Sequence, residues 1–317
     1  MRMVKPFEAH CTVRLSIVRR FTASFALFFA VAMPISGCSS KSDSAVPPLL
    51  GPIHAISTVN AIARPIDAYT PTVTQVRALY HAADIETAEC MKSFGFTVSP
   101  NNSSDNFSDL SDEYKMRSAL YGFFDPEDVP VKGYDVFVSQ AQDSSNGKPL
   151  SSAEIGVYTG ANKSGVAISS YGGKPVPKGG CNEYGVNFIG GEPPDPGTVG
   201  SLPDGGPPIP TSDPRIIAVD QEWSICMKAK GFSYPSPIAA YTDPRWGQAR
   251  TASATEISTA VADMTCKAST NLMGISVAVE DAYDDRYIQT HTAALAKFHQ
   301  QLVNAVMKAN QIIAAGY

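Results

Sequence analysis

The chain has 317 residues, and 44% of them are hydrophobic, which is enough for a folded core. Five of the 25 basic residues and one of the 30 acidic residues lie at positions 1–37, so residues 38–317 carry 20 basic and 29 acidic residues, a formal charge of −9. A negative balance of that size argues against a protein that binds nucleic-acid phosphates.

Residues 1–37 have the three parts of a secretory signal peptide. Arginines precede an apolar run at residues 21–33, and small residues follow it at Ser36 and Gly37. The run is too short to span a bilayer, which needs roughly 20 apolar residues. We therefore expect export of the chain and cleavage after Gly37. An ordinary signal peptide followed by a chance cysteine is the alternative to the interpretation that follows.

Ile35-Ser36-Gly37-Cys38 resembles the lipobox of bacterial lipoproteins. In that family, diacylglycerol is attached to the cysteine, which becomes the first residue of the mature protein. The resemblance implies an extracytoplasmic protein that is anchored to the cell membrane by a lipid on Cys38. Residues 38–71 lack periodicity and are expected to form a tether between the lipid and the folded body.

A first helical unit is expected over residues 72–190. Apolar residues recur at 3-4 spacing from residue 74 to residue 94, which predicts a helix. Residues 139–180 are rich in Ser, Gly, Asn and Lys, which indicates exposed loops with small helical or β pieces. Pro and Gly dominate residues 191–214, which favours a linker.

A second helical unit is expected over residues 215–317. Periodicity predicts a helix at residues 216–230, and Ser253 with Glu256 forms the capping-box pattern that begins another helix.

The longest helical pattern covers residues 276–314. Its apolar residues repeat at 3-4 spacing along a narrow seam, which includes His291. A narrow seam needs a partner helix, either residues 74–94 or a second protein chain.

Four cysteines follow Cys38, and an even number in an exported protein favours two disulfides, with three pairings open. The segment Cys-Met-Lys-Ser-Phe-Gly-Phe from Cys90 is echoed as Cys-Met-Lys-Ala-Lys-Gly-Phe from Cys226. In both copies the glycine can supply a left-handed helix cap, and one more cysteine follows each copy. The simplest interpretation is a duplication with Cys90–Cys181 and Cys226–Cys266 disulfides. Shared capping chemistry alone is the alternative explanation of the echo.

The lipobox, the paired Cys-Met-Lys segments, and the segments that end in Gly-Gly-Cys181 and Asp-Met-Thr-Cys266 resemble a large group of secreted lipoproteins from high-GC Gram-positive bacteria. The similarity covers most of residues 73–315. That group has no settled biochemical function, so the resemblance implies location and cross-linking and supplies no catalytic residue. The chain departs from the group after Cys181, where Asn182-Glu183-Tyr184-Gly185 replaces a more helical tail.

Few residues suggest a chemical site. None of the four histidines after Cys38 lies in a nucleophile-elbow or metal-binding motif, so we expect no cofactor and no metal. The acids at positions 280, 281, 284 and 285 open the long helical pattern and are expected to be solvated near a helix N-terminus.

Aromatic residues gather in one Pro-containing connection. Tyr234, Tyr241 and Trp246 form a candidate binding surface on which a sugar or peptide of the cell wall could stack. The alternative is that these rings pin a long loop onto the core.

These features predict a mainly α-helical fold with long irregular loops, minor β structure, two disulfide-linked helical units and a long C-terminal helix. The expected function is that of a non-enzymatic, lipid-anchored cell-envelope protein that binds or scaffolds an envelope component, either a partner protein or a cell-wall polymer. The alternative is a cell-wall polymer hydrolase, which would need two acidic side chains about 5–9 Å apart in a cleft.

Overall fold

Helices dominate the fold, as the sequence predicts. The computed structural model describes residues 46–100, 115–134, 150–194, 197–249 and 251–316. Cys38, the expected lipid site, lies outside these residues. The described chain from Val46 onward belongs to one compact unit. In chain order the elements are η1 (Val59–Ala61), η2 (Pro65–Ala68), α1 (Val73–Ser93), β1 (Arg117–Ser118), β2 (Gly122–Phe123), α3 (Val129–Lys132), α4 (Ser152–Thr159), β3 (Ser170–Tyr171), β4 (Lys174–Pro175), α5 (Gly180–Ile189), η4 (Pro203–Gly205), α6 (Pro214–Ala229), α7 (Pro237–Tyr241), α8 (Ala254–Ser269) and α9 (Leu272–Ala315).

The strands contribute little to the fold. β1 pairs with β2, and β3 pairs with β4, each as a short antiparallel ladder. None of the described helices is long and apolar enough to cross a membrane.

Local sequence signals explain where the main helices begin. Thr72 and Gln75 form a capping box at the start of α1. Ser253 accepts a hydrogen bond from the Glu256 backbone N–H at the start of α8. The Glu256 carboxylate accepts a bond from the Tyr134 N–H at 3.2 Å, so this side chain also ties α8 to the segment after α3.

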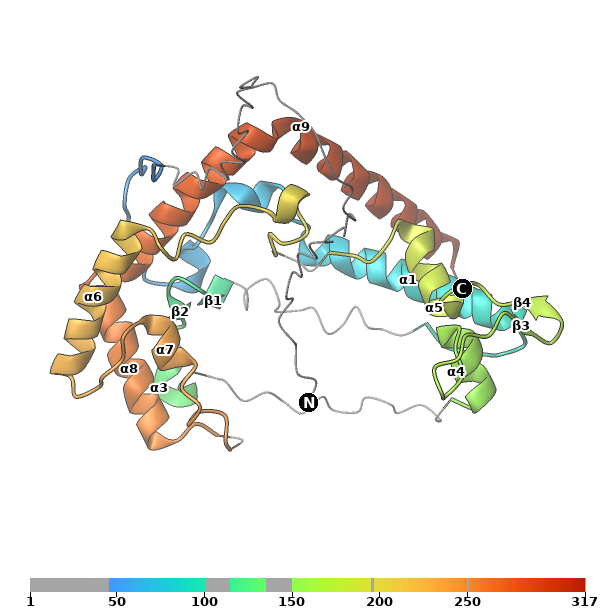
Figure 1. Ribbon diagram of the computed structural model, residues 1–317, viewed down its shortest axis with the longest axis horizontal. Coiled ribbons are helices and arrows are strands. Elements are labelled where there is room, and N and C mark those ends of the chain that lie inside the picture. The colour runs from blue at the N-terminus through green and yellow to red at the C-terminus, as the bar shows by residue number, and fades with distance from the viewer. Residues whose placement is uncertain (1–45, 101–114, 135–149, 195–196, 250, 317) are drawn as a thin grey trace, which may run out of the picture. The chain divides into compact units, whose positions relative to one another are not determined.

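The long C-terminal helix α9 (Figure 1, red) contributes residues to three hydrophobic clusters of the described chain. Its first turns, with Leu272 and Val277, pack into a core shared with α6 and α8. Its last turns, with Leu302 and Ala309, pack against Leu79 of α1. Of the two partners that the sequence left open for the apolar seam, the structure provides α1 from the same chain.

Helix α9 is interrupted at His291, whose backbone is non-helical (φ −117°, ψ 16°). The imidazole Nδ1 lies 2.9 Å from the Tyr287 carbonyl oxygen, and the two rings stack with centroids 4.2 Å apart. A side chain that reaches the carbonyl of the preceding turn disturbs the regular helical ladder there, which accounts for the kink. Nε2 faces Asp204 of η4 at 3.5 Å.

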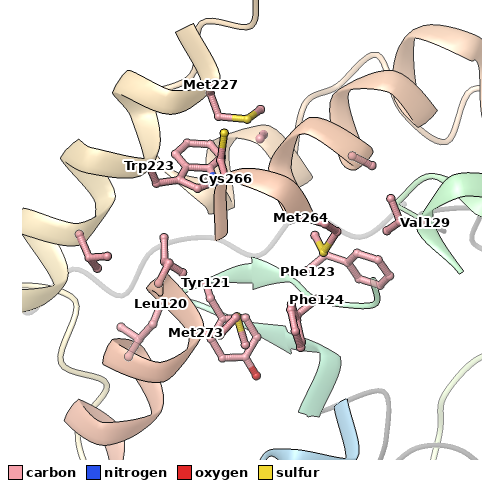
Figure 2. Packing of buried hydrophobic residues seen from close by; sticks show 14 of the residues in the cluster. Leu120, Tyr121, Phe123, Phe124, Val129, Trp223, Met227, Met264, Cys266 and Met273 are labelled. Atoms are coloured by element: carbon pink, nitrogen blue, oxygen red, sulfur yellow. The ribbon is translucent and has the colours of Figure 1, made fainter. Parts of the chain in front are cut away.

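Residues 115–134 belong to the expected first unit but pack against helices of the second one. Leu120, Phe123 and Val129 belong to the core formed with α6, α8 and α9. Figure 2 shows Phe123 and Phe124 in the same cluster as Trp223 of α6. This part of the expected first unit is therefore built into the second one, because its apolar side chains complete the core of α6 and α8.

The expected tether and linker also pack onto the body where they are described. Ile66 is fully buried and Ile62 is 3% exposed, although both lie in the expected tether. Leu202 of the Pro- and Gly-rich segment is buried against Tyr287 and Leu295 of α9. Isolated apolar residues without periodicity thus contribute to the packing of both segments.

Candidate functional site

Both disulfides join the cysteines that the sequence paired. Cys90 is bonded to Cys181 with Cα atoms 5.5 Å apart, and Cys226 is bonded to Cys266 with Cα atoms 5.7 Å apart. Cys181 lies in the first turn of α5, whereas Cys266 lies near the end of α8. The pairing is confirmed, but the helices that receive the two bonds are not equivalent, so the bonds do not require a duplication. The tail after Cys181 is helical, unlike the expectation for Asn182–Gly185.

The echoed segments form the same helix end twice. The Gly95 N–H donates to the Lys92 carbonyl oxygen and the Phe96 N–H to that of Met91; Gly231 and Phe232 repeat both bonds. The two glycines have φ values of +86° and +91°, as a left-handed cap requires. This repeated cap fixes the direction in which the chain leaves each cysteine-bearing helix.

The aromatic connection is largely packed inward. Trp246 is 6% exposed and donates from Nε1 to the Ala240 carbonyl oxygen at 2.7 Å. Tyr241 stacks on Phe123 with ring centroids 5.8 Å apart. Tyr234 is half-buried and its hydroxyl donates to Asp243 at 2.8 Å. Burial of the Trp246 ring favours the interpretation that these aromatics pin the loop onto the core.

A charged cluster joins the expected tether to α9. Arg64 makes a bidentate contact with Asp284, from Nη2 to Oδ1 at 2.5 Å and from Nε to Oδ2 at 3.0 Å. Its Nη1 lies 3.7 Å from Glu280, which also accepts a hydrogen bond from Ser118 at 3.5 Å. Asp284 and Glu280 are buried, so the expectation of solvation is wrong for these two acids, whereas Asp285 is exposed as expected. The two buried acids lie more than one turn beyond the start of α9, on the face that contacts the rest of the chain.

Burial raises the proton affinity of these acids. It raises the pKa of Glu280 and of Asp284, and the Arg64 charge opposes that rise at both carboxyls. Burial, followed by repulsion from Asp284, raises the pKa of Asp281 to about 7. The cluster therefore combines one cation with three acids that bind protons more tightly than exposed carboxyls do.

A cavity of about 650 Å³ opens beside this cluster, between the expected tether, β1 and the segment before η4. Three cationic side chains line it, Arg64, Lys115 and Arg117, together with Glu280. Its volume falls within the roughly 300–1,000 Å³ of small-ligand clefts.

Aromatic packing holds one of the cavity's cations in place. Arg117 donates from Nε to the Tyr241 hydroxyl at 2.9 Å, and its guanidinium lies 5.2 Å from the centre of the Phe123 ring. Of the three aromatic residues singled out in the sequence, Tyr241 thus contributes to a candidate site indirectly, by orienting Arg117 at the cavity wall.

A second cleft of about 620 Å³ follows the apolar seam between the end of α5 and the last turns of α9. Leu79, Phe188 and Leu302 line it, and Lys308 donates to the Phe188 carbonyl oxygen at its edge. Within the described ranges, no group of three or more His, Cys, Asp or Glu side chains could hold a metal ion. The cavity beside Arg64 brings together more groups that can bind a polar ligand, so we take it as the candidate site.

No family model, curated protein or solved structure matches this chain. The candidate site therefore rests on its own geometry. The sequence did not reveal this site, because its charged residues, such as Arg64 and Glu280, are far apart in the chain and no spacing rule connects them. The one available signal was the i,i+4 spacing of Glu280 and Asp284, which places both acids on one helix face.

Proposed function

We propose that this chain is an extracytoplasmic lipoprotein, anchored to the membrane through Cys38, that binds a polar cell-wall component in the cavity beside Arg64. The two disulfides of the described body support an oxidising compartment outside the cytoplasm. The lipobox resemblance supports the anchor. Binding without catalysis is the activity proposed for the folded body.

The observation that carries the binding proposal is the composition of the cavity wall. Lys115, Arg117 and Arg64 present positive charge, while Glu280 and Asp67 add acceptors. Such a mixed wall suits a ligand that carries carboxylates together with hydrogen-bond donors, as the sugar–peptide network of the wall does. The negative charge of the whole body disfavours a highly charged polyanion such as nucleic acid.

Co-sedimentation of the purified full chain with purified peptidoglycan tests this proposal. The chain is expected to pellet with the polymer, and Lys115→Glu is expected to weaken pelleting because it reverses a charge on the cavity wall. Lys163→Glu is the matched control, since Lys163 is exposed in a loop and does not line the cavity. Absence of pelleting, or equal losses in both variants, contradicts binding at this cavity.

One observation favours the alternative of a cell-wall polymer hydrolase. Glu280 lines the cavity, is buried and has a raised pKa, as a general acid requires. Hydrolysis predicts release of soluble fragments from peptidoglycan by the wild-type chain and loss of that release in Glu280→Gln. Pelleting without fragment release supports binding alone.

A further inference from the structure

A second acid–base pair lies wholly inside the protein, away from the cavity. Asp263 and Lys267 stand one turn apart on α8, and both side chains are 0% exposed. Lys267 Nζ lies 2.8 Å from Asp263 Oδ2. The exposed pair Asp128–Lys132 has the same spacing, but its side chains are 50% and 54% exposed. The buried pair therefore combines contact with exclusion of water.

Neighbouring groups hold the Asp263 carboxyl and the Lys267 amine in place. The Trp223 Nε1–H donates to Asp263 Oδ1 at 2.9 Å, so this oxygen is held by a donor while Oδ2 faces the amine. Lys267 Nζ also donates to the Phe123 carbonyl oxygen, which limits rotation of the amine. Trp223 and Phe123 lie in the hydrophobic core that Figure 2 shows, and their bulky rings help to exclude water from the pair.

Burial drives the two groups toward their neutral forms. It raises the pKa of Asp263 and lowers the pKa of Lys267, and each shift is opposed by the charge of the other group. A neutral amine is a nucleophile and a protonated carboxyl is a competent acyl group, whereas the ionised pair is unreactive. Contact between two fixed groups in a dry site also supplies the large effective concentration that intramolecular reactions exploit.

We propose that Lys267 Nζ and Asp263 Cγ join in an intramolecular amide bond that forms within the folded protein. The amine lone pair attacks Cγ, a C–N bond forms, and the bond from Cγ to Oδ2 breaks. Nitrogen loses one proton to the departing oxygen, which already carries the carboxyl proton, so one water molecule leaves. No electrons are transferred, and no co-reactant is needed.

Two further residues serve the reaction. The Trp223 N–H stabilises the negative charge that develops on Oδ1 during the attack. Asp220 is assigned the proton transfer from nitrogen to the departing oxygen, because its charge acts on Lys267 and its Oδ1 is buried without a hydrogen-bond partner among the described residues. The product closes one turn of α8 covalently and replaces two buried titratable groups by one uncharged amide.

Peptide mass spectrometry of the purified full chain, reduced, alkylated and digested with trypsin, tests the proposal. Trypsin cannot cut after an acylated lysine, so residues 251–286 are expected as one peptide that is lighter by one water molecule than the same sequence with alkylated Cys266. Fragmentation is expected to give no single-break ions between Asp263 and Lys267. Efficient cleavage at Lys267, with residues 251–267 at their unmodified mass, overturns the proposal.

Internal and mutational controls complete the test. Cleavage after Lys132 is expected to be normal, because the exposed Asp128–Lys132 pair is solvated; loss of water at that pair as well would mean an artefact of digestion and would overturn the proposal. Lys267→Arg is expected to restore cleavage at position 267 at the unmodified mass. Asp220→Asn is expected to leave a larger uncross-linked fraction soon after folding, and an unchanged fraction removes Asp220 from the mechanism.

Discussion

Arg64 forms ion pairs between the expected tether and two acids of α9. Its bidentate bond to Asp284 places a carboxylate with no exposed area against a guanidinium that is only 22% exposed. Each charge of such a pair stabilises the other, because removal of one leaves the other buried without this partner of opposite sign.

We expect Asp284→Ala to lower the free energy of unfolding by about 3 kcal/mol, since it removes the acid that makes the bidentate contact with Arg64 and leaves the more distant Glu280. Asp285→Ala is the control: Asp285 is the next residue of the same helix and is exposed, so its loss should change stability by less than about 0.5 kcal/mol. Urea unfolding measures both changes. Equal effects of the two substitutions would contradict a stabilising role for the Arg64 pair.

Asp281 should make stability depend on pH. Burial and the neighbouring acids Asp284, Glu280 and Asp285 raise its pKa to about 7, against the opposing charge of Arg64. The folded state therefore binds a proton that the unfolded state releases near 3.8, so stability falls as pH rises between these two values.

Asp281→Asn removes this titration, so the variant should melt at a higher temperature than the wild type at about pH 8 and lose that advantage near pH 4. Glu222→Gln, which replaces an exposed acid on α6, is the control variant. Thermal unfolding at several pH values compares the melting temperatures of the wild type and both variants. A wild-type advantage that grows toward alkaline pH would reverse the predicted sign.

Among the elements, α1 and α6 end in the same way because they carry the same cap sequence. An added Cβ at Gly95 or at Gly231 would meet no atom within 4 Å, yet both glycines have a positive φ. The conformational cost of a side chain can therefore be measured at these caps without a steric clash.

Gly95→Ala and Gly231→Ala should each destabilise the protein by about 1 kcal/mol, because the left-handed conformation costs L-residues roughly that amount. Gly51→Ala serves as the control, since Gly51 also has open space around it but no positive φ. Its effect should be neutral or slightly stabilising. Chemical unfolding of the three variants compares them, and a cost at Gly51 equal to that at the caps would refute the argument.

Sequence patterns predicted those helices whose signals are local. Helices α1, α6, α8 and α9 were predicted because capping residues and 3-4 periodicity are local. The disulfide pairing was predicted because each Cys-Met-Lys segment is a local pattern, and its two copies each precede one further cysteine. Helix α5 was missed, since Asn182-Glu183-Tyr184-Gly185 is polar and short, and its helical state depends on packing against α1.

At the scale of the whole molecule, the long-range contacts were the features that sequence patterns could not supply. Residues 115–134 lie in the expected first unit, yet their apolar side chains complete the core of α6 and α8. The candidate cavity was likewise not predictable, because Arg64, Lys115 and Glu280 meet only after the chain folds. Single charges and isolated apolar residues carry no periodicity, so their burial depends on tertiary structure alone.

The attachment of the chain to a membrane by Cys38 is the central claim about the whole molecule. Mass spectrometry of the mature N-terminal peptide, taken from protein made in a bacterium that processes lipoproteins, tests it most directly. The account predicts a chain that begins at Cys38 and carries a diacylglycerol on its sulfur, together with loss of membrane attachment in Cys38→Ala. An uncleaved leader, or a Cys38 without lipid in the membrane-bound protein, would contradict it.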